Sequence, residues 1–217
     1  MGQCNGIQRA KNKTKNKNET NSTTNNSQPY ITSFNSYPKK LNYENYRDNE
    51  SNNNKQYNNN NDIKNNKNNS FLYNIIMKAL EIHNTFRIKH DSKKLSLNIN
   101  LCEIAQKYAE KCSETNSTDH YCNLYNNEII GQNIEVVDEK SFNVSDICNR
   151  WYNEKEQYDF TLKKFNSKAR HFTQLIWKKT ELVGFGYSKS DEGKAYFVAC
   201  YYPAGNILNK FSENVKK

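Results

Sequence analysis

The sequence predicts an α+β domain, with helices packed on an antiparallel sheet, behind a polar N-terminal arm. Helical stripes of apolar residues come first along the chain, and β-rich runs come late. No repeated strand–helix–strand unit, which would build a parallel sheet, interrupts that order. Residues 1–70 hold 22 asparagines and almost no Leu, Val or Ile, so they cannot bury enough apolar area to fold. One domain of about 150 residues is therefore expected in the rest of the chain.

Four helices are expected where apolar residues recur every three or four positions. The second begins at an Asn100 N-cap, the third follows Ser141, and the short fourth carries Phe172, Leu175 and Ile176. Their predicted ranges are 71–90, 101–112, 144–158 and 172–176.

Strands are expected mainly in the last third of the domain. Residues 182–187 and 195–202 are β-rich runs on either side of a polar Ser-Asp-Glu-Gly turn, which predicts a hairpin. Residues 134–137 supply another candidate strand. Gly184 and Gly186 indicate a close approach by another backbone. The large aromatic residues and two histidines are expected to serve packing: Trp151, Trp177, Tyr201, His83 and His90.

Positive charge is concentrated at the start of the chain. The net charge is +9, and residues 1–70 contribute +6 of it, from 11 basic and 5 acidic residues. Five basic residues precede the first acidic one: Arg9, Lys11, Lys13, Lys15 and Lys17. Such a run suits an anionic membrane surface or nucleic acid, and it also suits a solvated tail. Because no recognition signature accompanies the aromatic residues of the arm, nucleic acid is not an expected partner.

The first residues resemble an acylation signal. Removal of Met1 would expose the Gly2 amine, where myristate is attached in this pattern, although Gly6 replaces the usual Ser or Thr. One myristoyl chain binds a membrane only marginally, with an association constant of about 10⁴ M⁻¹, so a second signal is needed. Palmitate on Cys4 and the basic run each supply one. Residues 1–18 are therefore interpreted as an acylation and polybasic segment, and residues 19–70 as a disordered linker.

The cysteines and the apolar runs of the sequence indicate which cellular compartment to expect for the protein. Cys4 lies in the arm, which leaves five cysteines in the domain: Cys102, Cys112, Cys122, Cys148 and Cys200. This odd number, and an N-terminus without an apolar signal-peptide core, predict free thiols in a reducing compartment. One or two internal disulfide bridges stay open as an alternative. No apolar run approaches the roughly 18 residues that a membrane-spanning helix needs.

Two late segments resemble the signature motifs of the CAP superfamily, which comprises cysteine-rich secretory, antigen 5 and pathogenesis-related 1 proteins. They are HFTQLIWKKT at residues 171–180 and YFVACYYPAGNI at residues 196–207. Shorter matches at residues 83–87 and 150–152 support the resemblance. Among the branches, the chain looks most like the Golgi-associated plant pathogenesis-related proteins, which are intracellular and N-myristoylated. The resemblance implies a CAP domain over residues 71–214, folded as an α-β-α sandwich with a central cleft.

The cleft of this family holds two histidines and two acidic residues. The resemblance assigns His120 and His171 to the histidine positions and Glu154 to one acid, while Gln132 stands where the family usually has the other. Imidazole nitrogens suit zinc, so His120, His171 and Glu154 form a candidate site for a weakly bound zinc ion. Gln132 adds no negative charge, which lowers the expected affinity, and it cannot serve as a general base. The opposing interpretation is a hydrogen-bonded polar cluster that braces the sandwich.

No catalytic residue is assigned, because the sequence has no nucleophile elbow and no serine beside the cleft acid position. We expect a non-enzymatic protein that Gly2 and Cys4 anchor to the cytosolic face of the Golgi or plasma membrane. Its expected partners are anionic membrane lipids, a protein or a second copy of the chain, and no cofactor is required. The alternatives are a metal-dependent hydrolase that uses the two-histidine cleft and a secreted, extracellular protein with disulfide bridges.

Overall fold

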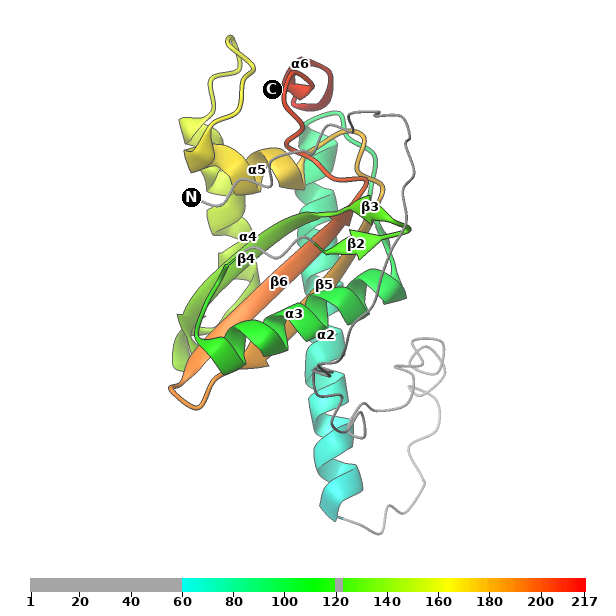
Figure 1. Cartoon of the computed structure of the whole chain (residues 1–217), viewed down its shortest axis with the longest axis vertical. Helices are drawn as coiled ribbons and strands as arrows, with labels where there is room; N and C mark the ends of the chain where they lie inside the picture. Colours follow the sequence, from blue (N-terminus) through cyan, green and yellow to red (C-terminus); the bar gives the residue numbers. More distant parts are fainter. Residues whose placement is uncertain (1–59, 120–122) are drawn as a thin grey trace, which may run out of the picture. The chain divides into compact units, whose positions relative to one another are not determined.

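The computed structural model describes residues 60–119 and 123–217, with side chains from residue 70 onward. Helices lie on both faces of a four-stranded sheet (Figure 1). One face is covered by α3 (Ile99–Thr115), and the other by α2 (Asn60–Lys89), α4 (Val144–Asn153) and α5 (Arg170–Leu175). The expected α-β-α sandwich is therefore confirmed. None of the described helices has both the length and the apolarity needed to cross a bilayer.

The sheet has the strand order β1-β5-β6-β4. Its strands are β1 (Ser96–Leu97), β4 (Gly131–Asp138), β5 (Leu182–Lys189) and β6 (Lys194–Tyr202). The β5–β6 hairpin and the strand expected at 134–137 are confirmed, and both pairs that β6 forms are antiparallel. The expected antiparallel sheet has one parallel edge, where the two-residue β1 pairs with β5. A strand of that length has too few residues to show an apolar alternation.

The register of β4 against β6 decides which side chains face which helices. Gln132 lies opposite Cys200, and Cys200 belongs to the apolar cluster formed with α3. Because side chains alternate along a strand, Asn133 points to the opposite face, where its amide contacts the first turn of α5. A small separate hairpin precedes this strand and consists of β2 (Leu124–Tyr125) and β3 (Glu128–Ile129).

α3 lies directly on the backbone of β5. A Cβ atom added at Gly184 would lie 2.2 Å from the Cys102 nitrogen, and one added at Gly186 would lie 2.3 Å from the Ala105 carbonyl carbon. The predicted close backbone approach is therefore confirmed, with α3 as the approaching element.

Helix ends differ from their predicted positions. α2 begins at Asn60 rather than at residue 71. The added residues are polar and show no apolar periodicity, so the sequence pattern could not locate the start of the helix. The N-cap of α3 is Asn98 and not Asn100: its backbone is extended, and its side chain accepts a hydrogen bond from the Leu101 nitrogen at 3.0 Å. α4 ends at Asn153, so Glu154 lies at its end and begins the short helix η3 (Glu154–Gln157). The remaining short helices are η2 (Glu139–Ser141), η4 (Ser167–Ala169) and α6 (Phe211–Asn214).

The residues assigned to packing are buried. Trp151 and Trp177 are each 1% exposed, and Tyr201 is fully buried, which confirms their place in the core. Arg87 is buried as well, and its guanidinium donates to four backbone carbonyls, those of Lys93, Leu175, Trp177 and Thr180. Burial lowers the pKa of Arg87 to about 10, so the side chain is still charged at neutral pH. It joins the end of α2 to the segment that follows α5.

Candidate functional site

Glu154 and His171 meet where α4 ends and α5 begins. Glu154 Oε1 lies 2.6 Å from His171 Nδ1. Glu154 Oε2 accepts hydrogen bonds from the backbone nitrogens of His171, at 2.9 Å, and Phe172, at 3.3 Å. A carboxylate only accepts, so the Nδ1 atom carries a proton, and in the neutral ring the lone pair is on Nε2. The carboxylate thereby fixes both the orientation and the tautomer of His171.

The local sequence explains why Glu154 reaches this helix end. Ala169, the N-cap residue of α5, has no side chain that can accept from the free backbone N–H groups of the first turn. Glu154 supplies the missing acceptors from a neighbouring segment, and its negative charge suits the positive end of the helix dipole. The site is thus built into the junction between the two helices.

No described residue is a hydrogen-bond partner of the other ring nitrogen of His171. His171 is 7% exposed, its Nε2 atom is buried, and no described residue bonds to it. The ring lies beside Trp151, with 5.7 Å between ring centroids. Buried polar atoms are nearly always paired in folded proteins, so this lone pair marks a position where another group would be stabilised.

A chain of hydrogen bonds that the sequence did not reveal connects this junction to α2. Asn133 Nδ2 donates to the carbonyl of His171 at 3.1 Å and to the Tyr201 hydroxyl at 3.2 Å. That hydroxyl lies 2.8 Å from His83 Nε2, and His83 Nδ1 lies 2.8 Å from the carbonyl of Ala79. The only available signal was a weak one, an amide residue directly before the strand expected at residues 134–137. The network braces the sandwich through buried polar groups.

Glu135 is a second residue that sequence reasoning missed. Its two carboxylate oxygens accept from Arg150 Nε and Trp151 Nε1, each at 2.9 Å. It lies on the same face of β4 as Asn133, two residues further along. This carboxylate therefore holds α4, and with it the Trp151 ring, against the sheet.

The four cleft positions expected from the family resemblance are not all brought together by the described residues. Glu154 and His171 are in direct contact. Gln132 lies on the α3 face of β4, with its Nε2 atom 3.9 Å from Cys200 Sγ. His120 falls outside the described residues, as do the predicted lipidation sites Gly2 and Cys4. The basic residues predicted to contact a membrane are also outside them: Arg9, Lys11, Lys13, Lys15 and Lys17.

Residues 60–119 and 123–217 contain no group of three or more His, Cys, Asp and Glu side chains that could hold a metal ion. The described cysteines Cys102, Cys112, Cys148 and Cys200 are buried free thiols. Burial raises the pKa of Cys148 and of Cys200 to about 12, so neither is a thiolate at neutral pH.

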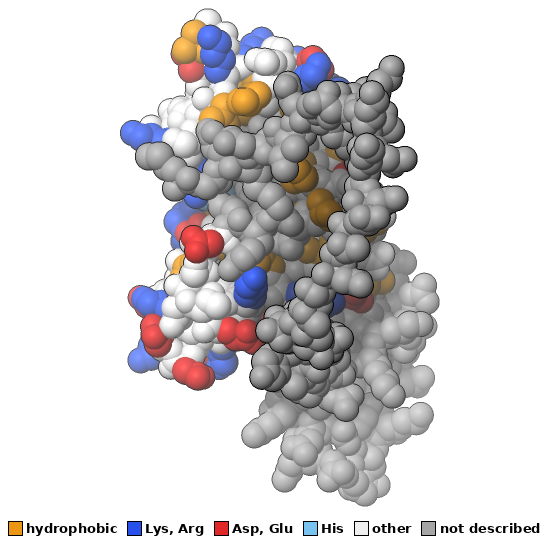
Figure 2. All heavy atoms as spheres, viewed as in Figure 1, with side chains coloured by type: hydrophobic (Ala, Val, Ile, Leu, Met, Phe, Trp, Pro, Cys, Tyr) orange, Lys and Arg blue, Asp and Glu red, His pale blue; other side chains and the backbone are white. Residues whose placement is uncertain are grey.

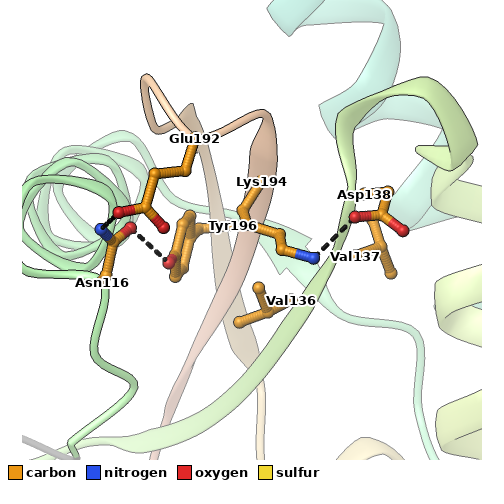
Figure 3. A pocket seen from close by; sticks show the side chains of 7 residues that line it. All are labelled: Asn116, Val136, Val137, Asp138, Glu192, Lys194 and Tyr196. Atoms are coloured by element: carbon orange, nitrogen blue, oxygen red, sulfur yellow. Dashed lines mark hydrogen bonds and ion pairs between the residues drawn. The ribbon is translucent and has the colours of Figure 1, made fainter.

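A pocket of about 420 Å³ lies beside the C-terminal end of β4 (Figure 3), whereas Asn133, which contacts His171, lies near the start of that strand. It is lined by Asn116, Val136, Val137, Asp138, Glu192, Lys194 and Tyr196. Its polar groups bond to one another: Lys194 Nζ pairs with Asp138 at 2.6 Å, and the Asn116 side chain bonds both Glu192 and Tyr196. Since these groups satisfy each other, the Glu154–His171 junction is the better candidate for a functional site.

Comparison with known families decides the classification. The sequence model of CAP, the cysteine-rich secretory protein family, matches residues 80–202. The chain belongs to the CAP family. Human Golgi-associated plant pathogenesis-related protein 1 is 34% identical over 145 residues, which cover 66% of this chain and 91% of the human protein. Protein PRY2 of Saccharomyces cerevisiae is 33% identical over 135 residues, 61% of this chain but only 38% of the yeast protein.

Solved structures include similar chains. The venom allergen-like protein 4 of Schistosoma mansoni shares 22% sequence identity, with a TM-score of 0.49. The alignment covers 61% of this CAP chain and 90% of the parasite chain.

Proposed function

We propose that this CAP protein is anchored to the cytosolic face of a membrane by acyl chains on Gly2 and Cys4, where its domain binds lipids or partner proteins. The observation that carries the proposal is the sequence Gly2-Gln3-Cys4, followed by five basic residues before the first acidic one. The human relative, described by its name as Golgi-associated, supports a membrane location.

The chemistry of the described domain supports binding rather than catalysis. Both oxygens of Glu154 already accept hydrogen bonds that brace the start of α5. The buried thiols with raised pKa values are unsuited to nucleophilic attack at neutral pH. We therefore assign the domain a recognition role.

The anchor is tested by expressing Gly2→Ala in cells and separating membranes from cytosol. Loss of the myristate acceptor should move the protein from the membrane fraction to the soluble fraction, because the basic run alone binds weakly and reversibly. Ala10→Gly, a small-residue change outside the acylation pattern of the first six residues, is the matched control and should leave the protein on membranes. Membrane recovery of Gly2→Ala equal to that of the wild type would overturn the anchor.

A second candidate function, weak zinc binding, is favoured by the buried Nε2 of His171. A metal-ligating histidine commonly donates its other ring N–H to a carboxylate, which is what Nδ1 does toward Glu154. His171 and His120 would hold the ion through ring nitrogens, with Glu154 orienting His171. Bound zinc would supply a Lewis acid at this junction.

Calorimetry with zinc tests this candidate. The wild-type protein should release a small binding heat that disappears in His120→Ala and in His171→Gln. His90→Gln is the control, because the His90 side chain bonds the carbonyl of Lys216 and the Tyr152 hydroxyl instead. Identical isotherms for the wild type and His120→Ala would exclude the site.

A further inference from the structure

Two neighbouring loops present large apolar side chains to solvent. The loop between η3 and η4 exposes 64% of Leu162 and 44% of Phe165. The segment that follows β6 exposes 51% of Ile207 and 70% of Leu208. Four such residues on loop tips are costly to leave in water, which points to a partner that covers them.

The two loops are fastened to the same end of the domain. Phe165 packs edge-on against Phe211, with 6.1 Å between ring centroids, and Phe211 follows the second loop directly. Asn206 accepts a hydrogen bond from the Thr173 hydroxyl at 2.6 Å and donates one to the Arg170 carbonyl at 2.9 Å. Both loops thus meet at the start of α5. Figure 2 shows hydrophobic and basic side chains close together at the end of the molecule where the yellow loop of Figure 1 projects.

Unneutralised positive charge surrounds these apolar residues. Lys163, Lys164 and Lys168 are exposed, and their ammonium groups have no acidic partner within the described part of the chain. Lysines nearby do have partners: Lys178 pairs with Asp91 at 2.8 Å and Lys210 with Glu213 at 3.2 Å. We define the loop surface as Leu162, Phe165, Ile207 and Leu208 together with Lys163, Lys164 and Lys168.

We infer that the loop surface docks on an anionic lipid bilayer, with its apolar side chains entering the interface and its lysines contacting the phosphate-bearing headgroups. The inference rests on the proposed function, since it deepens what the domain binds beside the anchor. Apolar side chains on projecting loops, interleaved with free ammonium groups, suit a deformable anionic phase better than a shaped protein groove. The anchor and the loop surface would then hold the domain at two points, which fixes its orientation.

Insertion is tested directly with Leu162→Trp in the full-length, unacylated chain. The native Trp151 and Trp177 are buried and give a constant fluorescence background. On vesicles of phosphatidylcholine and phosphatidylserine in equal parts, emission of the variant should shift to the blue and be quenched by lipids brominated on the acyl chains. Phe71→Trp, at a similarly exposed position on α2, is the control and should show neither change. Equal responses of the two variants would overturn the inference.

Binding is tested with paired substitutions in the same chain. Leu162→Ser/Leu208→Ser should lower the vesicle partition coefficient about tenfold, because two exposed side chains no longer enter the interface. Phe71→Ser/Met77→Ser removes two exposed apolar groups from α2 and should leave it unchanged. Lys164→Glu should weaken binding about tenfold on anionic vesicles, and weaken it less at high salt. Lys140→Glu, at the opposite end of the sheet, is the control for this change of charge and should leave vesicle binding unchanged.

The outcomes separate the loop surface from the anchor. Vesicle binding by unacylated protein does not depend on Gly2 chemistry, so a failed Gly2→Ala fractionation leaves this test intact. Partitioning of Leu162→Ser/Leu208→Ser and Lys164→Glu equal to that of the wild type would overturn the loop surface alone. Loss of binding in the α2 control as well would also overturn it, because the apolar contribution would then not be specific to the loops.

Discussion

His83 is a titratable side chain that the fold keeps uncharged. Its ring is fully buried between the Ala79 carbonyl and the Tyr201 hydroxyl. The carbonyl can only accept, so Nδ1 carries the proton and Nε2 accepts from the hydroxyl. Burial lowers the pKa of His83 from 6.5 to about 4. The neutral ring is therefore required for the hydrogen bonds that connect α2 to β6.

This residue makes stability depend on pH. The unfolded chain binds a proton at His83 below pH 6.5 whereas the folded chain does not, so stability is lost as the pH falls toward 4. Between pH 7 and pH 5 the loss from this group is about 2 kcal/mol in the free energy of unfolding. Urea unfolding at both pH values measures it.

The control for that prediction is His83→Gln, which cannot take up a proton in this range. Its free energy of unfolding should be lower at pH 7, but it should change less between the two pH values. If the wild type and the variant lose the same stability on acidification, His83 is not the group responsible.

At the scale of elements, the contact between α3 and β5 depends on glycine. The Cβ atom of Gly186→Ala would lie against the α3 backbone, which cannot move aside as a flexible side chain can. We expect a loss of about 3 kcal/mol in the free energy of unfolding, from separation of the helix and the sheet. Denaturant unfolding of the purified protein measures this loss.

Gly193→Ala is the matched control in the turn of the hairpin. Gly193 has a positive φ of 75° but open space around it, so only backbone strain opposes the substitution. Gly193→Ala should lower the free energy of unfolding by about 1 kcal/mol. A cost for Gly186→Ala no greater than this would contradict the close packing of α3 on the sheet.

The helices and strands differ in how well the sequence predicts them. Apolar periodicity located α3, α4 and the β5–β6 hairpin, because their buried faces repeat with the period of the structure. It missed β1, whose two residues cannot display a period, and it placed the start of α2 too late. The choice of Asn98 over Asn100 as N-cap depends on the extended backbone at the end of β1, which follows from pairing with β5.

For the whole molecule, the state of the thiols distinguishes a reducing from an oxidising compartment. We expect the buried Cys102, Cys112, Cys148 and Cys200 to resist a thiol reagent at pH 8 in the folded protein. All four should react once the chain is unfolded without a reductant. Mass spectrometry of labelled peptides from the unmutated chain reports on each of these four thiols separately. Fewer than four reactive thiols in protein from its native cells would favour the secreted, disulfide-bonded alternative.

Sequence alone was enough to predict the family and most of the helices and strands, and it singled out Glu154 and His171, which lie in direct contact. These follow from local periodicity and from motifs that are continuous in the chain. Tertiary structure decided that Asn133 and Glu135, and not Gln132, face the helices that carry the site, because a strand's register is set by its partner strand. It also brought the two apolar loops together at the start of α5, through contacts between residues far apart in sequence.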